Sequence, residues 1–463
     1  MEEKYDAFFQ LCRRVEDVFE ADWRETDELS RAGKLEREKR AIIGYEKDRK
    51  FYQDRIREIL SSRGWNEIAH PPWYRNLEEG VFHEVYGLAG LAPWVYDTTE
   101  EYRNSSSAKL IGERLYCMID GKTVLQPQRI SDRRREQLKR ALLLSTPRER
   151  LEYGFHEVYL HNGIRITIFS GERTKKNQDV MIFRKYLLRD LTFENLAELG
   201  TIPSEAIPLF KVMVKIGFNI LISGPVRSGK TTFLQIWQKY EDPHLEGLAV
   251  STDPETPWHE IMPDAPIIQL VADGSDLHHL TKPLMRGDND YILLEEMRDA
   301  SAYHLALGIT SAGSMRCKAT IHDGSSANIP YKMASAVHET FGGNLQSLIA
   351  QVFRSFHLVF RFSQGYPDKS KKHLMSICAY QYDFHCDQVS VHELCRYQPE
   401  KKCWHWKADT GWAEEINGLE TMRKELNRME ELLKELELRN PLRGNTVIYP
   451  RYYRPDSREG APE

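Results

Sequence analysis

The stretch LISGPVRSGKTTFL, residues 221–234, decides the fold. An apolar run precedes Gly224, a helix-like run follows Thr232, and the residues between them fit the phosphate-binding pattern G-x-x-x-x-G-K-[ST]. Gly224 and Gly229 permit a backbone whose N–H groups point at phosphate oxygens, and the dipole of the following helix adds positive potential. The stretch therefore predicts a nucleotide-binding loop between a strand and a helix.

This loop supplies a full set of candidate binding residues. In this motif the lysine, Lys230, contacts the β and γ phosphates, and the hydroxyl of Thr231 binds Mg²⁺. We therefore expect ATP and Mg²⁺ as cofactors. The candidate nucleotide-binding residues are Gly224, Pro225, Val226, Arg227, Ser228, Gly229, Lys230, Thr231 and Thr232.

The sequence around the loop predicts an α/β core. From about residue 190, short apolar runs alternate with helical patterns, which is typical of a largely parallel sheet covered by helices. The expected strands are FNILIS (218–223), GLAVST (247–252), PIIQLVA (266–272), DYILLEE (290–296), CKATIH (317–322) and FHLVFRF (356–362). Residues 375–397 predict two further antiparallel strands.

We expect four segments along the chain. They are a helical N-terminal extension (1–63), a small α+β domain (64–186), the P-loop domain (187–405), and a C-terminal helix with a loosely ordered tail after Pro441 (406–463). The basic run SDRRREQLKR (131–140) is interpreted as a solvated helix face. Two readings of the C-terminal helix stay open, a short coiled coil or packing on its own domain. Its apolar seam is Leu419, Met422, Leu426, Met429, Leu433 and Leu436.

Several acidic residues and a histidine follow predicted strands. Glu295 and Glu296 end a buried strand, where α/β sheets bind their ligands. Adjacent strand residues point to opposite faces, so only one of the pair is expected to face the nucleotide, and the pattern leaves open which one. Asp253 follows the strand at 247–252, and His322 ends the strand at 317–322.

Composition restricts the class of protein. The 463 residues are 41% hydrophobic and 29% charged, with a net charge of −5, which predicts a globular protein without a strong nucleic-acid signal. No run of 18 apolar residues and no secretory signal is visible, and the seven cysteines are scattered, so we expect a cytoplasmic protein with reduced thiols. The Cys/His-rich segment 378–405 lacks a C-x-x-C pair, so no zinc site is expected.

The motifs together resemble the secretion ATPases of the type II/type IV secretion and type IV pilus superfamily, especially the Tad-pilus and conjugation-type branch. The likeness runs from about Leu88 to Trp404. VSTDPETP (250–257) is similar to the family's Asp box, and DYILLEEMRDASAYHLALGITSAGSMRCKATIHDGSS (290–326) to its Walker B and His-box segment. GIRITIFSGERTKKNQDVMIFRKY (163–186) resembles the strand pair that carries the family's N-terminal arginines.

The resemblance implies site roles for residues at matching positions. Glu296 matches the catalytic glutamate, which positions or activates the attacking water and assists Mg²⁺ binding directly or through water. The other matching catalytic residues are Arg165, Arg184, Asp253, Arg298 and His322. The resemblance also implies a RecA-like core, a hexameric ring, an inner-membrane platform protein as partner, and a peripheral position at the cytoplasmic face of the membrane.

Some positions depart from the family pattern. Glu295 stands where the family has glycine before its catalytic glutamate, and Thr252 stands where the Asp box usually has an acid. Three functions therefore remain open: a motor for pilus assembly or protein secretion, a conjugative DNA-transfer motor of the same fold, and a nucleotide-binding scaffold with little turnover.

Overall fold

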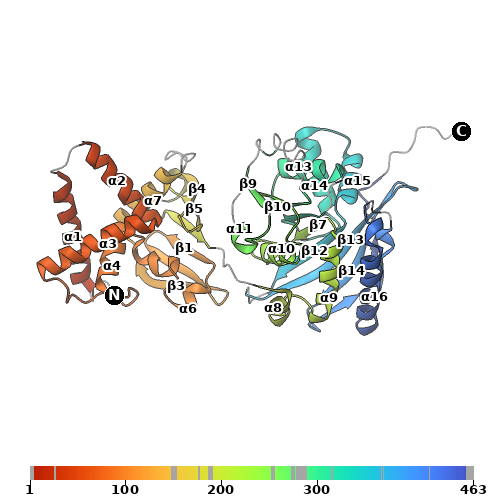
Figure 1. Ribbon diagram of the computed structural model, residues 1–463, viewed down its shortest axis with the longest axis horizontal. Coiled ribbons are helices and arrows are strands. Elements are labelled where there is room, and N and C mark those ends of the chain that lie inside the picture. The colour runs from red at the N-terminus through yellow and green to blue at the C-terminus, as the bar shows by residue number, and fades with distance from the viewer. Residues whose placement is uncertain are drawn as a thin grey trace. The chain divides into compact units, whose positions relative to one another are not determined.

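The computed structural model forms two compact units, Met1–Leu188 and Arg189–Glu463, which are described separately (Figure 1). The residues that the structure describes are 5–24, 28–146, 154–175, 178–185, 191–251, 256–272, 277, 289–313, 316–365, 368, 370–414, 416 and 418–454. None of the helices in these ranges combines the length and the apolar composition needed to cross a bilayer.

The first unit joins a group of helices to an antiparallel sheet in the order β3-β2-β1-β6-β5-β4. Its helices are α1 (Asp6–Arg24), α2 (Glu28–Ile43), α3 (Glu46–Arg63), α4 (Leu77–Tyr86), α5 (Ala92–Val95), α6 (Glu100–Arg103) and α7 (Asp132–Ser145). Its strands are β1 (Ser107–Ile111), β2 (Arg114–Ile119), β3 (Lys122–Arg129), β4 (Phe155–Tyr159), β5 (Arg165–Phe169) and β6 (Val180–Arg184). One apolar cluster lies among α1, α3 and α4, and another lies against the sheet.

The basic run of α7 is only partly solvated. Arg133 is exposed and pairs with Glu16 at 2.6 Å, but Arg134 is 5% exposed. The Arg134 guanidinium donates to the carbonyl oxygens of Val85, at 2.6 Å, and Gly87. The expectation of a solvated face is therefore wrong for Arg134, because its donors satisfy carbonyls at the C-terminal end of α4 that would otherwise be buried without partners.

The second unit is built on a mixed sheet in the order β15-β14-β13-β12-β7-β11-β10-β8-β9. Its strands are β7 (Ile220–Ser223), β8 (Gly247–Ser251), β9 (Ile267–Val271), β10 (Tyr291–Met297), β11 (Cys317–Ile321), β12 (Leu358–Gln364), β13 (Lys372–Asp383), β14 (Gln388–Gln398), β15 (Cys403–Trp406) and β16 (Val447–Ile448). Every neighbouring pair from β12 to β9 is parallel, and β12 to β15 are joined antiparallel.

Helices cover both faces of this sheet. They are α8 (Phe193–Glu198), α9 (Ile207–Ile216), α10 (Lys230–Lys239), α11 (Trp258–Ile261), α13 (Ala300–Ser311), α14 (Ile329–Phe341), α15 (Leu345–Ser355) and α16 (Arg423–Arg439). Residues of α9, α10 and α16 share one apolar cluster with the sheet, and residues of α13, α14 and α15 share the other (Figure 1). The predicted parallel α/β core and its six strands are confirmed, together with a smaller α+β N-terminal part.

The C-terminal helix packs on its own domain. Met429 and Leu433 of α16 are fully buried, and Leu436 is 4% exposed, all within the cluster that includes α9. Of the two open readings, packing on the domain is therefore confirmed.

The segment after Pro441 is docked on the same unit. Strand β16 pairs with β14, the Tyr452 hydroxyl donates to the Ala327 carbonyl oxygen at 2.6 Å, and the Tyr453 hydroxyl donates to Asp387 at 2.8 Å. The expectation of a loosely ordered tail is therefore wrong for residues 441–454, because aromatic packing and hydrogen bonds hold them. Residues 455–463 lie outside the described residues.

Candidate functional site

The phosphate-binding loop joins β7 to α10 at the carboxyl end of the parallel strands. Gly224 has φ +147°, and a Cβ atom there would lie 2.3 Å from the Phe362 carbonyl oxygen. Gly229, with φ +94°, forms the N-cap of α10, which begins at Lys230. Both glycines are therefore required by backbone conformation, and the first also by the close approach of β12.

The Lys230 ammonium group is buried inside this loop. Its Nζ donates to the carbonyl oxygens of Gly224, at 3.0 Å, and Pro225, at 2.9 Å, and lies 3.3 Å from His322 Nδ1. In the described part of the chain, the buried Ser228 Oγ has no hydrogen-bond partner. A buried cation beside an unsatisfied hydroxyl, at the positive end of a helix, fits the phosphates of a nucleotide.

A β-bulge sets the direction of the two glutamates of β10. The pairing of β10 with β11 slips between Leu294 and Met297, and Glu296 adopts φ +60°, a left-handed conformation that is uncommon for a glutamate. The Glu296 amide donates to the Thr320 hydroxyl at 2.9 Å instead of continuing the ladder. The carboxylates of Glu295 and Glu296 therefore contact different residues.

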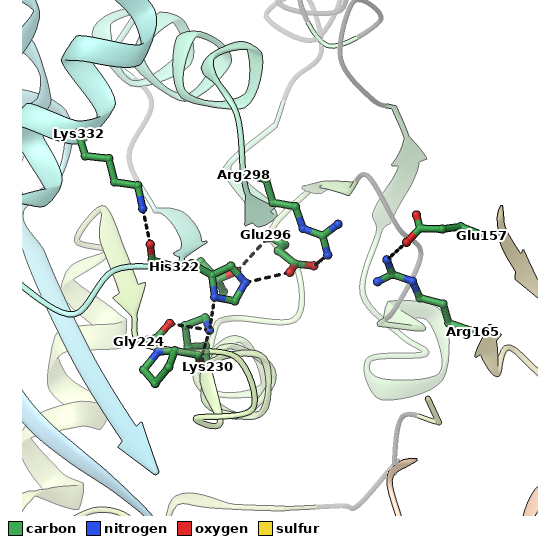
Figure 2. A network of polar contacts seen from close by, with 10 residues as sticks. Glu157, Arg165, Gly224, Lys230, Glu296, Arg298, His322 and Lys332 are labelled. Carbon is green, nitrogen blue, oxygen red and sulfur yellow. Dashed lines mark hydrogen bonds and ion pairs between the residues drawn. The ribbon is translucent and has the colours of Figure 1, made fainter. Parts of the chain in front are cut away.

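The structure answers which glutamate faces the loop. Glu295 is 8% exposed and accepts a hydrogen bond from the Trp258 indole at 3.0 Å. The Glu296 carboxylate instead accepts one from His322 Nε2, at 3.0 Å, and pairs with Arg298 at 2.5 Å (Figure 2). Since His322 also contacts Lys230, Glu296 is the carboxylate connected to the phosphate-binding loop.

The surroundings of Glu296 keep its carboxylate ionised. Burial acts to raise the pKa of Glu296, but the hydrogen bonds from His322 and Arg298 and the positive charge of Arg298 outweigh it and lower the pKa to about 2. Lys332 of α14 donates to the His322 carbonyl oxygen and lies 3.5 Å from Asp323, so it fixes the backbone that carries the histidine (Figure 2).

The two N-terminal arginines lie next to each other on adjacent strands of the first unit. Arg165 on β5 and Arg184 on β6 are direct cross-strand partners. Arg165 is 5% exposed and pairs with Glu157 at 2.5 Å, which offsets the repulsion between the two arginines. Their contact with a nucleotide remains a prediction.

The remaining predicted site residues are not all described. Thr231 and Thr232 are half-buried in the first turn of α10. The Thr231 hydroxyl and the Glu296 carboxylate are oxygen donors of the kind that Mg²⁺ prefers. Asp253 lies outside the described residues. Among the described residues there is no group of three or more His, Cys, Asp or Glu side chains arranged to hold a metal ion.

Sequence reasoning missed three residues that orient this site. Thr320, Lys332 and Trp258 hold the Glu296 amide, the His322 backbone and the Glu295 carboxylate. A threonine two positions before His322 in a buried strand was a usable signal, since a buried hydroxyl needs a partner. Lys332 and Trp258 carried no such signal, because their contacts form only in the folded chain.

Comparison with known proteins agrees with the motifs. The family described as Type II/IV secretion system protein matches this chain over residues 176–406. An uncharacterised protein of Bacillus anthracis is 21% identical over 209 residues, which are 44% of this chain and 46% of that protein. This chain thus spans about half the length of that curated relative.

Solved structures also show similarity at low identity. The pilus retraction motor PilT with bound ADP has a TM-score of 0.45 and 15% identity, covering 75% of this chain and 93% of that one. The Legionella pneumophila ATPase DotB has a TM-score of 0.40 and 14% identity, covering 75% and 86%. The VirB11 ATPase of the Brucella suis type IV secretion system has a TM-score of 0.34 and 16% identity, covering 62% and 92%.

Proposed function

Since this chain belongs to the type II/IV secretion system protein family, we propose that it is an ATP-hydrolysing motor for type IV pilus assembly, of the Tad type, or for protein secretion. The observation that carries the proposal is the line of contacts from Lys230 through His322 to Glu296. It joins the lysine of the phosphate-binding loop to an ionised carboxylate at the end of a parallel strand, which is the arrangement that phosphoryl transfer to water requires.

Lys230 and Thr231 bind the triphosphate in this proposal. The Lys230 ammonium donates to neutral carbonyl oxygens of the loop, and exchanging these for anionic phosphate oxygens gives stronger, charge-assisted hydrogen bonds. Bound Mg²⁺ supplies positive charge that stabilises the phosphates during transfer, with Thr231 and Glu296, directly or through water, as its proposed protein ligands.

Glu296 orients the water that attacks the γ-phosphorus. With a pKa of about 2 it is ionised at neutral pH and accepts a hydrogen bond from the water, but it is too weak a base to remove the proton at the outset. The water oxygen then bonds to the γ-phosphorus while the bond from that phosphorus to the ADP oxygen breaks, and the proton of the water passes to the inorganic phosphate that forms. Arg298 and His322 keep the carboxylate ionised, and Arg298 also neutralises charge on the transferred group.

The proposed motor also uses residues outside the phosphate-binding loop and works as an assembly of several chains. Arg165 and Arg184 stabilise phosphate charge from the first unit, and Asp253 contributes a carboxylate from the segment after β8. The chain works as a hexameric ring, bound to an inner-membrane platform protein at the cytoplasmic face of the membrane. A conjugative DNA-transfer motor would use the same residues on another cargo.

A scaffold with little turnover is the second candidate. It is favoured by the engagement of Glu296 with both Arg298 and His322, which must loosen before a water can take their place. The two candidates predict the same nucleotide binding and differ in turnover.

The test is the steady-state ATPase rate of the full chain, measured with nucleotide affinity and with particle size in the presence and absence of ATP. The variant Lys230→Ala should lose binding and turnover, and Glu296→Gln should bind ATP but turn over at least about 100-fold more slowly. Lys215→Ala and Glu198→Gln change exposed residues of the same unit and serve as matched controls. A wild-type protein that binds ATP, assembles and turns over no faster than Glu296→Gln would leave the scaffold as the function.

A further inference from the structure

Glu295 has a defined place in this site although its side chain does not face the phosphate-binding loop. It pairs through its backbone with Ser251 of β8, and its carboxylate accepts the indole hydrogen bond of Trp258 at 3.0 Å. Trp258 is fully buried in the cluster that contains Phe233 and Leu293. We propose that Glu295 is a positioning residue, which ties the end of β10 to α11 and so fixes the direction of Glu296.

The segment that Glu295 holds is anchored on its other sides as well. Thr256, two residues before Trp258, is fully buried. Its carbonyl oxygen accepts from Gln269 of β9 at 2.5 Å, and its hydroxyl accepts from Gln235 of α10 at 3.4 Å. The hydrogen bonds of Thr256 therefore fix the start of α11 to β9 and α10. The hydrogen bond between Trp258 and Glu295 fixes α11 to β10. Because α11 is held by several elements, it can support the bulge of β10.

The bulge needs such a support. Glu296 follows Glu295 directly and has φ +60°, so its backbone is in a conformation that the chain does not favour by itself. Its own contacts are the Thr320 hydroxyl on the amide and the side chains of His322 and Arg298 on the carboxylate. Fixing the preceding side chain on a buried tryptophan restricts rotation of the peptide that joins the two glutamates.

Glu295 and Trp258 depend on each other chemically. A buried indole N–H without an acceptor is unfavourable, and so is a buried carboxylate without a donor. Glutamine keeps one acceptor oxygen for the indole N–H and removes the charge, with an NH2 group in place of the second oxygen.

The proposal rests on the proposed ATPase function, and its experiment has one readout that does not depend on turnover. Hydrogen exchange of residues 256–262 and 291–298 is measured in the full chain for the wild type and for Glu295→Ala, Glu295→Gln, Trp258→Phe and the double variant Glu295→Ala/Trp258→Phe. ATPase kinetics are measured on the same proteins. Glu260→Ala, which removes an exposed carboxylate from α11, is the matched control.

A positioning role predicts a specific pattern. Glu295→Ala and Trp258→Phe speed exchange in both segments and lower kcat about tenfold, while KM for ATP changes less than about twofold. The double variant is no slower than the single ones, because both remove the same contact. Glu295→Gln keeps slow exchange and most of kcat, and Glu260→Ala matches the wild type.

Other results overturn the proposal. If Glu295→Gln is as inactive as Glu296→Gln with exchange unchanged, Glu295 takes part in the reaction itself. If Glu295→Ala matches the wild type in both readouts, the contact positions nothing, and if exchange rises throughout residues 191–454, its role is general stability. A wild-type protein without turnover defeats the proposed function, and the exchange pattern alone then decides whether Glu295 holds α11 and β10.

Discussion

At the scale of single residues, the Glu296 backbone is held by a side chain from another strand. Its amide donates to the Thr320 hydroxyl on β11, at the point where the bulge interrupts the ladder between β10 and β11. Thr320 is 3% exposed, so water cannot easily replace its hydroxyl. The direction of the carboxylate therefore depends on a buried hydroxyl of the neighbouring strand.

This dependence predicts the effect of removing one hydroxyl. Thr320→Val keeps the shape of the side chain but leaves the Glu296 amide without its acceptor, and we expect kcat to fall about tenfold with KM for ATP nearly unchanged. Thr320→Ser keeps the acceptor and is the matched control. Equal kcat values for the two variants would show that this hydrogen bond does not orient Glu296.

The pKa of Glu296 predicts a pH dependence of stability. Because the pKa is lowered from 4.5 to about 2 in the folded protein, the unfolded chain binds more protons between these values. The stabilisation, at most about 3 kcal/mol, is complete above pH 4.5 and is lost as the pH falls toward 2. The wild type should therefore melt at a higher temperature than Glu296→Gln at pH 6, and the difference in Tm should shrink steadily between pH 4.5 and 3. A difference that stays constant or widens in acid would contradict this assignment.

At the scale of elements, α16 is part of the core of the second unit. Its buried face lies in the same apolar cluster as α9 and the sheet, while its opposite face is solvated. Leu433 and Leu438 lie on the same helix, and they are 0% and 85% exposed. The buried leucine reports on packing of α16 against its own domain, and the exposed leucine reports on any contact of the opposite face.

The two leucines supply a matched pair of substitutions. Leu433→Ala opens a cavity in the core and should lower the free energy of unfolding by about 2–5 kcal/mol, whereas Leu438→Ala should leave it within about 0.5 kcal/mol. Denaturant unfolding followed by circular dichroism measures both. A large loss of unfolding free energy for Leu438→Ala, with none for Leu433→Ala, would mean that α16 packs on the core through its opposite face.

At the scale of the whole molecule, the parts that local pattern determines were predictable. The phosphate-binding loop and the six parallel strands follow from the glycine spacing and from short apolar runs between helical patterns. Strand alternation left the choice between Glu295 and Glu296 open, because it does not reveal a bulge with φ +60°, and only the family resemblance pointed to Glu296. The burial of Arg134 and the docking of Tyr452 depend on carbonyl oxygens supplied by distant segments, which no local pattern contains.

The most direct measurement is single-turnover hydrolysis, with the full chain in excess over radiolabelled ATP and Mg²⁺. We expect the wild type to convert its bound ATP to ADP and phosphate, while Glu296→Gln binds the same amount of ATP and retains it intact at least about 100-fold longer. Equal rates of conversion in the two proteins, or bound ATP that stays intact in both, would show that Glu296 does not direct hydrolysis at this site.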